Sequence, residues 1–250
     1  MAYNSNQFCW HGVISTRPEE AARFYSKVLD WQIATIPMGD ENATFFQAAG
    51  VSRAHIMAPP MEGVPSHWDN YLRVDDVDAA TAAAVANGGS VVVRGMDIPP
   101  GRFSVVASPS GAAFSLFHEA DPASSEHAPD GVGSIHWVEL HSTNLAPDIA
   151  WLKATFGFEI DTMQMPNGDY FVLKSDGEMC GGATKQENPG APSMWLTWVS
   201  VADVDGTVST ASEAGGQVFV PPFDVPGVGR MSVLADPTGG VFGVITPPSE

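Results

Sequence analysis

The chain has 250 residues, enough for one large domain or two of ordinary size. Its 29 acidic and 11 basic residues give a formal net charge of −18, and such a surface repels nucleic-acid backbones and anionic lipids. We therefore expect no nucleic-acid or membrane partner. Because the start, MAYNSNQF, has no secretory signal, we expect a cytoplasmic location. Cys9 and Cys180 are too few for a disulfide framework or a zinc site, so we expect reduced, packed thiols.

The first β-type run, CWHGVIS, covers residues 9–15, and a helix is expected directly after it. Thr16 can cap this helix, Pro18 suits its first turn, and Glu19 completes an S/T-x-x-E capping box. The helix then presents an apolar face at helical spacing, formed by Ala21, Ala22, Phe24, Tyr25, Val28 and Leu29.

Three short strand signals follow the helix, at residues 31–36, 43–48 and 52–58. The pattern then starts again with a strand over 69–74 and a helix over 77–87, which ends at Gly88 and Gly89. Further strand signals lie near Val91, Phe103 and Ala113. The first half of the chain therefore predicts two βαβββ units.

The second half repeats the first at an offset of about 127 residues. VDDVDAATAAAVANGGSVVV, beginning at Val74, aligns with VADVDGTVSTASEAGGQVFV, beginning at Val201, with nine identities in twenty. GRFSVVASPSGAAF and GRMSVLADPTGGVF share eight of fourteen. We expect two modules, residues 1–120 and 134–250, joined by a linker rich in Pro, Ser and Asp over residues 121–133.

The predicted fold class is α+β, with four βαβββ units in tandem. Antiparallel strands curled with a helix on the outer face would make a half-barrel, and two such units can close around a cavity. That cavity is where we expect a small molecule to bind.

These motifs resemble the vicinal oxygen chelate superfamily, which groups glyoxalase I, extradiol dioxygenases and bleomycin-resistance proteins. The resemblance rests on the helix ends FYSKVLDW and WLKATFGF, on the V-x-D-V-D helix with its Gly-Gly stop, and on GR-x-SV-x-A-x-P-x-G. It implies two glyoxalase-like half-barrel modules. The sequence also resembles a two-module group described as hydroxylases of antibiotic biosynthesis, whose modules begin with Trp where the metal enzymes have His, as at Trp10 and Trp137.

The resemblance also implies where a divalent metal would be held in each module. The corresponding positions are Trp10, Asp69 and Ser115 in the first module, and Trp137, Leu196 and Gly243 in the second. Asp69 alone is a plausible ligand, and one carboxylate is not a site. We therefore expect no metal and no other cofactor, with a divalent metal as the alternative.

Alternation along a strand places residues two apart on the same face. If Trp137 faces the cavity of the second module, Glu139 and His141 face it as well, and Trp198 joins them from a second strand. Glu139 and His141 are our candidate catalytic acid–base pair. The alternative is a structural pair that satisfies its own hydrogen bonds, just as Trp137 and Trp198 could either pack in a core or stack on a ligand.

In the first module the same rule brings together Trp10, Asp69, Tyr71 and Arg73 as candidate ligand-binding residues. Arg73 could hold an anionic ligand, although pairing with Asp69 is the commoner outcome. We expect the histidines at 55 and 67 to be solvated, and His118 with Glu119 to mark the edge of the linker. Arg102 and Arg230 recur in both repeats and are expected to tie turns together with bidentate hydrogen bonds, or else to contact anions.

Two functions follow from the sequence. The first is a glyoxalase-like protein that binds a small hydrophobic or aromatic metabolite without a metal, with Glu139 and His141 as an acid–base pair if it is catalytic. The alternative is a metal-dependent lyase, isomerase or dioxygenase whose ligands include Glu139, His141 and another histidine. Either a monomer or a homodimer is compatible with the sequence.

Overall fold

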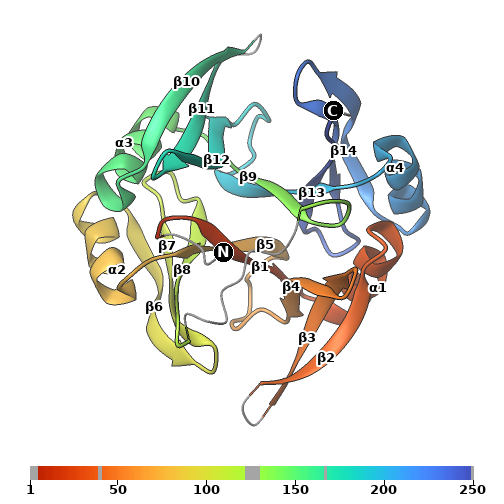
Figure 1. Ribbon diagram of the computed structural model, residues 1–250, viewed down its shortest axis with the longest axis horizontal. Helices are drawn as coiled ribbons and strands as arrows, with labels where there is room; N and C mark the ends of the chain where they lie inside the picture. Colours follow the sequence, from red (N-terminus) through yellow and green to blue (C-terminus); the bar gives the residue numbers. More distant parts are fainter. Residues whose placement is uncertain (1–4, 39–40, 122–129, 166–167, 249–250) are drawn as a thin grey trace. The chain divides into compact units, whose positions relative to one another are not determined.

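The structure, a computed structural model, describes residues 5–38, 41–121, 130–165 and 168–248. Figure 1 shows the described elements in chain order. The first half contains β1 (Phe8–Ile14), α1 (Pro18–Val28), β2 (Gln32–Met38), β3 (Glu41–Ala48), β4 (Val51–Met57), β5 (His67–Arg73), α2 (Val77–Ala86), β6 (Ser90–Ile98), β7 (Gly101–Ala107) and β8 (Ala113–Glu119).

The second half contains the same succession of elements. They are β9 (Ile135–Ser142), α3 (Leu145–Phe156), β10 (Glu159–Met165), β11 (Gly168–Ser175), β12 (Glu178–Lys185), β13 (Met194–Ser200), α4 (Val204–Glu213), β14 (Gln217–Val225), β15 (Gly229–Ala235) and β16 (Val241–Thr246). The predicted α+β fold of four tandem βαβββ units is therefore confirmed.

Each half forms one eight-stranded sheet, and the two sheets have the same strand order. The orders are β2-β3-β4-β1-β5-β8-β7-β6 and β10-β11-β12-β9-β13-β16-β15-β14. The meanders are antiparallel, as expected, and each sheet also contains parallel pairs: β1 with β4, β5 with β8, β9 with β12 and β13 with β16. In every βαβββ unit the helix carries the chain back, so the strand after the helix runs in the same direction as the first strand. The third strand of the meander runs in that direction again and can therefore pair with the first strand in parallel.

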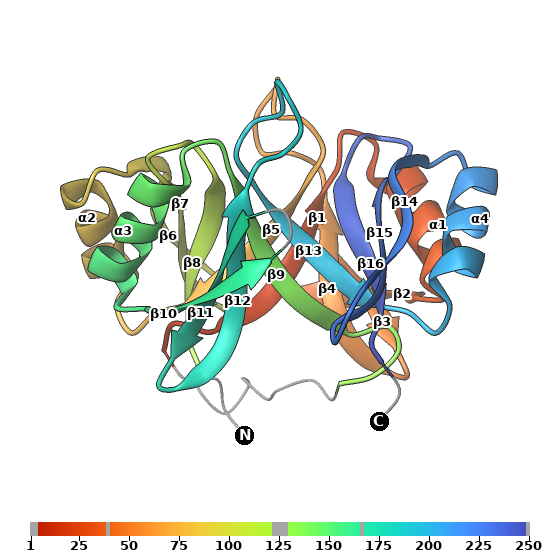
Figure 2. The ribbon, with the colours of Figure 1, turned by 90° about the horizontal axis from the view of Figure 1, so that it is seen from above.

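The chain divides into two compact units that do not coincide with the repeats. Unit 1 comprises the described residues of Met1–Trp10, Asp69–His127 and Trp137–Trp195. Unit 2 comprises those of His11–Trp68, Ala128–His136 and Leu196–Glu250. Unit 1 therefore contains the packed pair α2 and α3, and unit 2 the packed pair α1 and α4 (Figure 2). Of the predicted linker, residues 122–129 lie outside the described residues.

Each unit has an aromatic core to which both repeats contribute. In unit 2 the whole predicted apolar face of α1 is buried, and the Tyr25 ring meets those of Phe46, Trp68 and Phe242 edge-on. In unit 1 Phe114 contacts Trp151 and Trp195 at 5.4–6.0 Å between ring centroids. None of the helices in the described parts of the chain is long and apolar enough to cross a membrane.

The predicted N-terminal cap of α1 was wrong, although Pro18 does occupy the first turn. The cap position falls on Arg17, without a capping side chain. The Thr16 hydroxyl instead lies 3.2 Å from the Ser66 hydroxyl, and Ser15 Oγ accepts a hydrogen bond from the Arg17 amide at 3.1 Å. The Thr16 hydroxyl, which the capping box would use, therefore makes a tertiary contact with the loop before β5 instead.

The prediction that Arg102 and Arg230 tie the turns with bidentate hydrogen bonds is confirmed. Arg102 donates through Nε and Nη2 to the two carboxylate oxygens of Asp78 in the first turn of α2, at 3.1 and 2.9 Å. Arg230 makes the same fork with Asp205 in α4. Each guanidinium also reaches a carboxylate of its own hairpin, Asp97 or Asp224. The duplicated arginines therefore fasten a helix to a hairpin.

Candidate functional site

The candidate site lies on one face of β9, β11 and β12 in unit 1. Along β9, Val138 and Leu140 are buried in the core, so the residues that alternate with them project from the opposite face. Those residues are Trp137, Glu139 and His141, as the alternation predicted.

Four side chains on this face form one continuous chain of hydrogen bonds. The Trp137 Nε1–H donates to Tyr170 Oη at 2.8 Å, and Tyr170 Oη donates to Glu139 Oε2 at 2.7 Å. The other carboxylate oxygen, Glu139 Oε1, lies 2.6 Å from His141 Nε2. We call Trp137, Tyr170, Glu139 and His141 the relay cluster.

Gly182 on β12 makes room for the relay cluster. It lies opposite Glu139 in the parallel β9–β12 register. A Cβ atom on Gly182 would clash with Tyr170 Oη and would lie 2.9 Å from Trp137 Nε1. Glycine is therefore the residue that lets the tyrosine and indole rings meet over the backbone of β12.

The relay cluster is half-buried and carries a negative charge at its centre. The side chain of Glu139 is 11% exposed and that of His141 is 24% exposed, so the carboxylate is shielded while the imidazole is accessible. Burial, together with the adjacent Glu139 carboxylate, raises the pKa of Tyr170 well above its usual range. Tyr170 therefore stays protonated and donates a hydrogen bond. The imidazole of His141 is the solvent-accessible end of this series of hydrogen bonds.

The first repeat carries a different polar group, also in unit 1. Ser115 Oγ donates to Asp69 Oδ2 at 2.6 Å, and Tyr71 lies opposite Ser115 in the β5–β8 register. Burial, followed by the nearby Asp69 carboxylate, raises the pKa of Tyr71 well above its usual range. Trp10 is half-buried on β1. Asp69 and Tyr71 thus lie together as predicted, and their role in ligand binding stays a prediction.

The expected ion pair between Arg73 and Asp69 was wrong. Arg73 Nε instead lies 2.7 Å from Oε1 of the buried Glu119, and Arg73 Nη1 lies 3.6 Å from Asp75. Strand β8 extends to Glu119, so this residue belongs to the sheet and not to a linker edge. His118, its neighbour, places Nδ1 2.9 Å from the Val74 carbonyl oxygen.

Trp198 belongs to unit 2, apart from the unit that holds the relay cluster. Its side chain is 3% exposed and its ring covers Gly243, where a Cβ atom would lie 2.6 Å from Trp198 Cζ3. Its Nε1–H has no acceptor among the described residues. Its proposed contact with a ligand stays a prediction.

The positions that would hold a metal in this superfamily do not fit one. Leu196 is buried and has no donor atom, Gly243 is covered by an indole, and Asp69 accepts a hydrogen bond from Ser115. Nor do the described residues contain another group of three or more His, Cys, Asp or Glu side chains placed to hold an ion. The donor set of a metal centre is therefore missing from this part of the chain.

His55 is half-buried on β4 and not fully solvated as expected, whereas His67 is exposed. The imidazole of His55 lies over Gly12 on β1, where a Cβ atom would approach His55 Nε2 to 2.6 Å. Burial, and then the nearby His11, lower the pKa of His55 to about 4. His55 is therefore a neutral packing residue at neutral pH.

The two cysteines are free thiols, as predicted. Burial raises the pKa of both Cys9 and Cys180 to about 12. Because the thiolate is the reactive form, neither residue is set up as a nucleophile.

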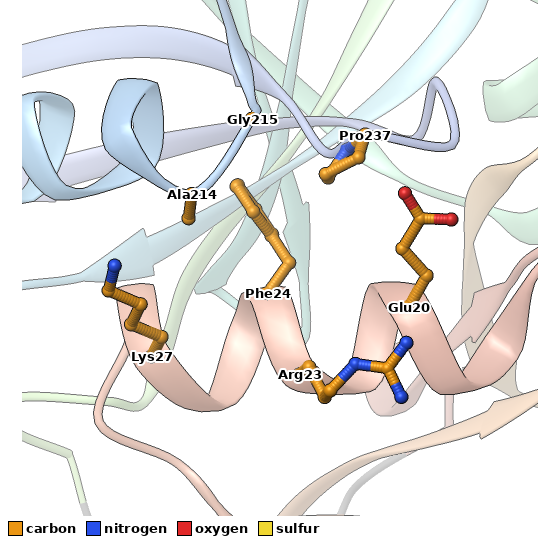
Figure 3. Close-up of a pocket in the computed structure, with 7 residues that line it drawn as sticks. All are labelled: Glu20, Arg23, Phe24, Lys27, Ala214, Gly215 and Pro237. Carbon is orange, nitrogen blue, oxygen red and sulfur yellow. The ribbon is translucent and has the colours of Figure 1, made fainter.

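A separate pocket of about 380 Å³ lies in unit 2, where α1 meets the end of α4, and Figure 3 shows the residues that line it. Phe24 fills its centre, and the Lys27 side chain points toward Ala214 at the carboxyl end of α4. A cation there complements the negative end of the helix dipole. We interpret this pocket as the junction of two packed helices.

Sequence reasoning did not identify Tyr170 and Gly182. Tyr170 carries no motif, and Gly182 stands in a Gly-Gly pair that is typical of a turn or a weak strand. The alignment of the repeats gives a partial signal, because Gly182 occupies the position of His55 in the first repeat.

Two family profiles match the chain. The glyoxalase-like domain matches residues 11–117. The glyoxalase/bleomycin resistance protein/dioxygenase superfamily matches residues 99–243.

Curated relatives match over nearly the full length. The Mycobacterium tuberculosis (strain CDC 1551 / Oshkosh) protein "Putative glyoxylase CFP32" is 33% identical over 95% of this chain and 94% of its own. The "Anthracycline biosynthesis protein DauV" of Streptomyces sp. (strain C5) is 30% identical over 94% of this chain and 91% of its own.

Solved structures share the fold at low sequence identity. The Mn(II)-bound glyoxalase from Novosphingobium aromaticivorans matches with a TM-score of 0.62 and 18% identity, over 97% of this chain and 82% of that chain. The 2,2',3-trihydroxybiphenyl 1,2-dioxygenase from Sphingomonas wittichii strain RW1 matches with a TM-score of 0.65 and 13% identity, over 97% and 91%. On the superfamily profile and the full-length relatives, the chain belongs to the glyoxalase/bleomycin resistance protein/dioxygenase superfamily.

Proposed function

We propose that this protein binds a small, neutral aromatic molecule at the relay cluster without a metal, and that Glu139 and His141 exchange a proton with it. The observation that carries the proposal is the hydrogen-bonded chain from Trp137 to His141, which joins an aromatic ring to a partly exposed imidazole. Flat rings with a few fixed polar groups are typical of small-molecule sites.

The charge of the cluster supports a neutral ligand. Glu139 places a shielded carboxylate behind the accessible imidazole, in a chain whose net charge is −18. An anionic ligand would be repelled both near the site and at long range. The relative named for anthracycline biosynthesis adds support for a fused aromatic ring system, since anthracyclines contain one.

The metal-dependent alternative has less support. It would require Glu139 and His141 to turn away from each other and to recruit a third donor, and the described residues place no such group beside them. Proton transfer between organic groups needs only the side chains that are present.

The proposal is tested by titrating the protein with 1,8-dihydroxyanthraquinone and following tryptophan fluorescence. We expect saturable quenching, and we expect Trp137→Leu to weaken binding by about tenfold, since loss of one aromatic contact costs about 1 kcal/mol or more. Phe219→Leu, at an exposed aromatic side chain on β14 in unit 2, is the control and should bind like the wild type. Equal binding by wild type and Trp137→Leu would contradict the proposed location.

Metal analysis of protein purified without chelator tests the second half of the proposal. We expect no stoichiometric transition metal. Near-stoichiometric Fe, Mn, Ni or Zn that is lost in His141→Ala, but kept in the neighbouring surface variant His136→Ala, would favour the metal-dependent alternative.

A further inference from the structure

We propose that the proton acceptor of this site is the Nδ1 atom of His141, held in that role by Glu139 and Tyr170, and that the substrate is a neutral acid whose anion is stabilised by conjugation. This inference rests on the proposed function for its ligand. The assignment of Nδ1 has independent support in the direction of the hydrogen bonds within the relay cluster.

Trp137 sets the direction of the hydrogen bonds in the relay cluster. An indole Nε1–H can only donate, so Tyr170 Oη must accept from Trp137. The single hydroxyl proton of Tyr170 is then available for its other partner, Glu139 Oε2, which lies 2.7 Å away. Glu139 therefore acts as an acceptor at this oxygen.

The same logic continues to the imidazole. A carboxylate has acceptors only, so Glu139 Oε1 accepts from His141 Nε2, 2.6 Å away. A neutral imidazole carries one N–H, and the tautomer follows from the partner that this N–H finds. The proton therefore lies on Nε2, and the basic lone pair lies on Nδ1, which has no partner among the described residues.

The surroundings of Nδ1 favour a particular class of substrate. When Nδ1 takes up a proton, the imidazolium is balanced by Glu139, and the negative charge moves to the substrate. The contacts of the relay cluster supply no other cation to stabilise it. The substrate anion must spread its own charge, as the anions of phenols and of C–H groups between carbonyls or beside an aromatic ring do.

A neutral probe whose negative charge also ends on a conjugated phenolate reports the transfer directly. In 5-nitrobenzisoxazole, a base removes the proton on C3, the electron pair of the C–H bond forms the nitrile, and the N–O bond breaks to leave a coloured phenolate. No oxidant, reductant or second reactant is needed. The neutral, flat, aromatic probe also matches the proposed ligand.

The first test is long-range ¹H–¹⁵N NMR of the histidine side chains, with the His141 signals assigned by their loss in His141→Ala. We expect a protonated Nε2 and a bare Nδ1. In Glu139→Gln, Tyr170 still requires the amide oxygen, so the amide NH₂ must face His141 Nε2 and the proton moves to Nδ1. A wild-type tautomer with the proton on Nδ1, or an unchanged tautomer in Glu139→Gln, would overturn the inference.

The second test is the rate of 5-nitrobenzisoxazole cleavage. We expect His141→Ala and Glu139→Gln each to lower the protein-catalysed rate by about 100-fold, and the exposed control His136→Ala to leave it unchanged. Full activity in His141→Ala would overturn the inference. Failure to bind 1,8-dihydroxyanthraquinone, with the expected NMR result, would instead count against the proposed function.

Discussion

At the scale of single residues, the two repeats use one design with the roles exchanged. In the β1–β4 pair, Gly12 faces His55, and in the β9–β12 pair, Glu139 faces Gly182. In each pair a glycine leaves the space that a titratable or aromatic side chain fills. In the first repeat that side chain is a neutral, packed histidine, and in the second repeat it belongs to the relay cluster.

Gly182→Ala should disrupt the relay cluster, since the added methyl group clashes with Tyr170 Oη. Overpacking of this kind costs about 1–3 kcal/mol. Urea unfolding measures the loss. The double variant Gly182→Ala/Tyr170→Phe should lose less than the sum of the two single changes, because the closest clashing atom, Tyr170 Oη, is gone and the ring carbon Cζ, 2.5 Å from the added methyl group, is the clash that remains. Strict additivity would contradict the clash.

His55 should make stability depend on pH in mild acid. Its pKa is about 4 in the folded chain and about 6.5 when unfolded, so the unfolded state binds more protons between these values. Stability should therefore fall as pH drops from about 6.5 to about 4, by about 1–3 kcal/mol. Urea unfolding at several pH values should show that the free energy of unfolding depends less steeply on pH in His55→Asn. The exposed control His67→Asn should keep the wild-type slope, and an equal slope in His55→Asn would contradict the assignment.

The sequence was sufficient to place Glu139 and His141 on one face, because alternation along a single strand is a local property. It could not reveal Tyr170, which comes from another strand whose register depends on a bulge between Leu173 and Lys174. Likewise, the partner of Arg73 depended on how far β8 extends, which the local pattern left open.

At the scale of elements, a buried network fixes α1 in unit 2. Tyr25 Oη donates to Asp236 Oδ2 at 2.8 Å and accepts from Trp68 Nε1 at 2.9 Å. The matching position in the second repeat is Leu152, so unit 1 is fastened differently. There the buried Asp148 of α3 accepts hydrogen bonds from Ser142 Oγ and the Ser110 amide. Helix spacing predicts which face is buried, but not these different fastenings.

Tyr25→Phe should destabilise the protein while the apolar packing is kept. It leaves Trp68 Nε1 without its acceptor and Asp236 without one of its donors, which costs about 1–3 kcal/mol. Thermal or urea unfolding measures the change. A stability equal to that of the wild type would show that Trp68 and Asp236 find other partners.

At the scale of the whole molecule, the repeats are units of sequence, whereas the compact units combine halves of both. The core of unit 2 joins residues of the first repeat, such as Phe24 and Trp31, to residues of the second, such as Val199 and Phe242. Internal similarity predicts where a motif recurs. It carries no information on which copies of the motif pack together.

Separated repeats should therefore not fold alone. Fragments 1–120 and 134–250 would each expose the surface that the other buries, so we expect neither to unfold cooperatively. Near-ultraviolet circular dichroism during heating measures this, and an equimolar mixture of the fragments should recover a cooperative transition. Cooperative unfolding of either fragment by itself would contradict the account of the two units.

The central claim is that the relay cluster binds a neutral aromatic molecule without a metal. Its most direct test is calorimetric titration of chelator-treated protein with 1,8-dihydroxyanthraquinone. We predict the same affinity before and after chelation, and the same affinity again after Mn²⁺ or Fe²⁺ is added. Binding that disappears with the chelator and returns with the metal would contradict the claim.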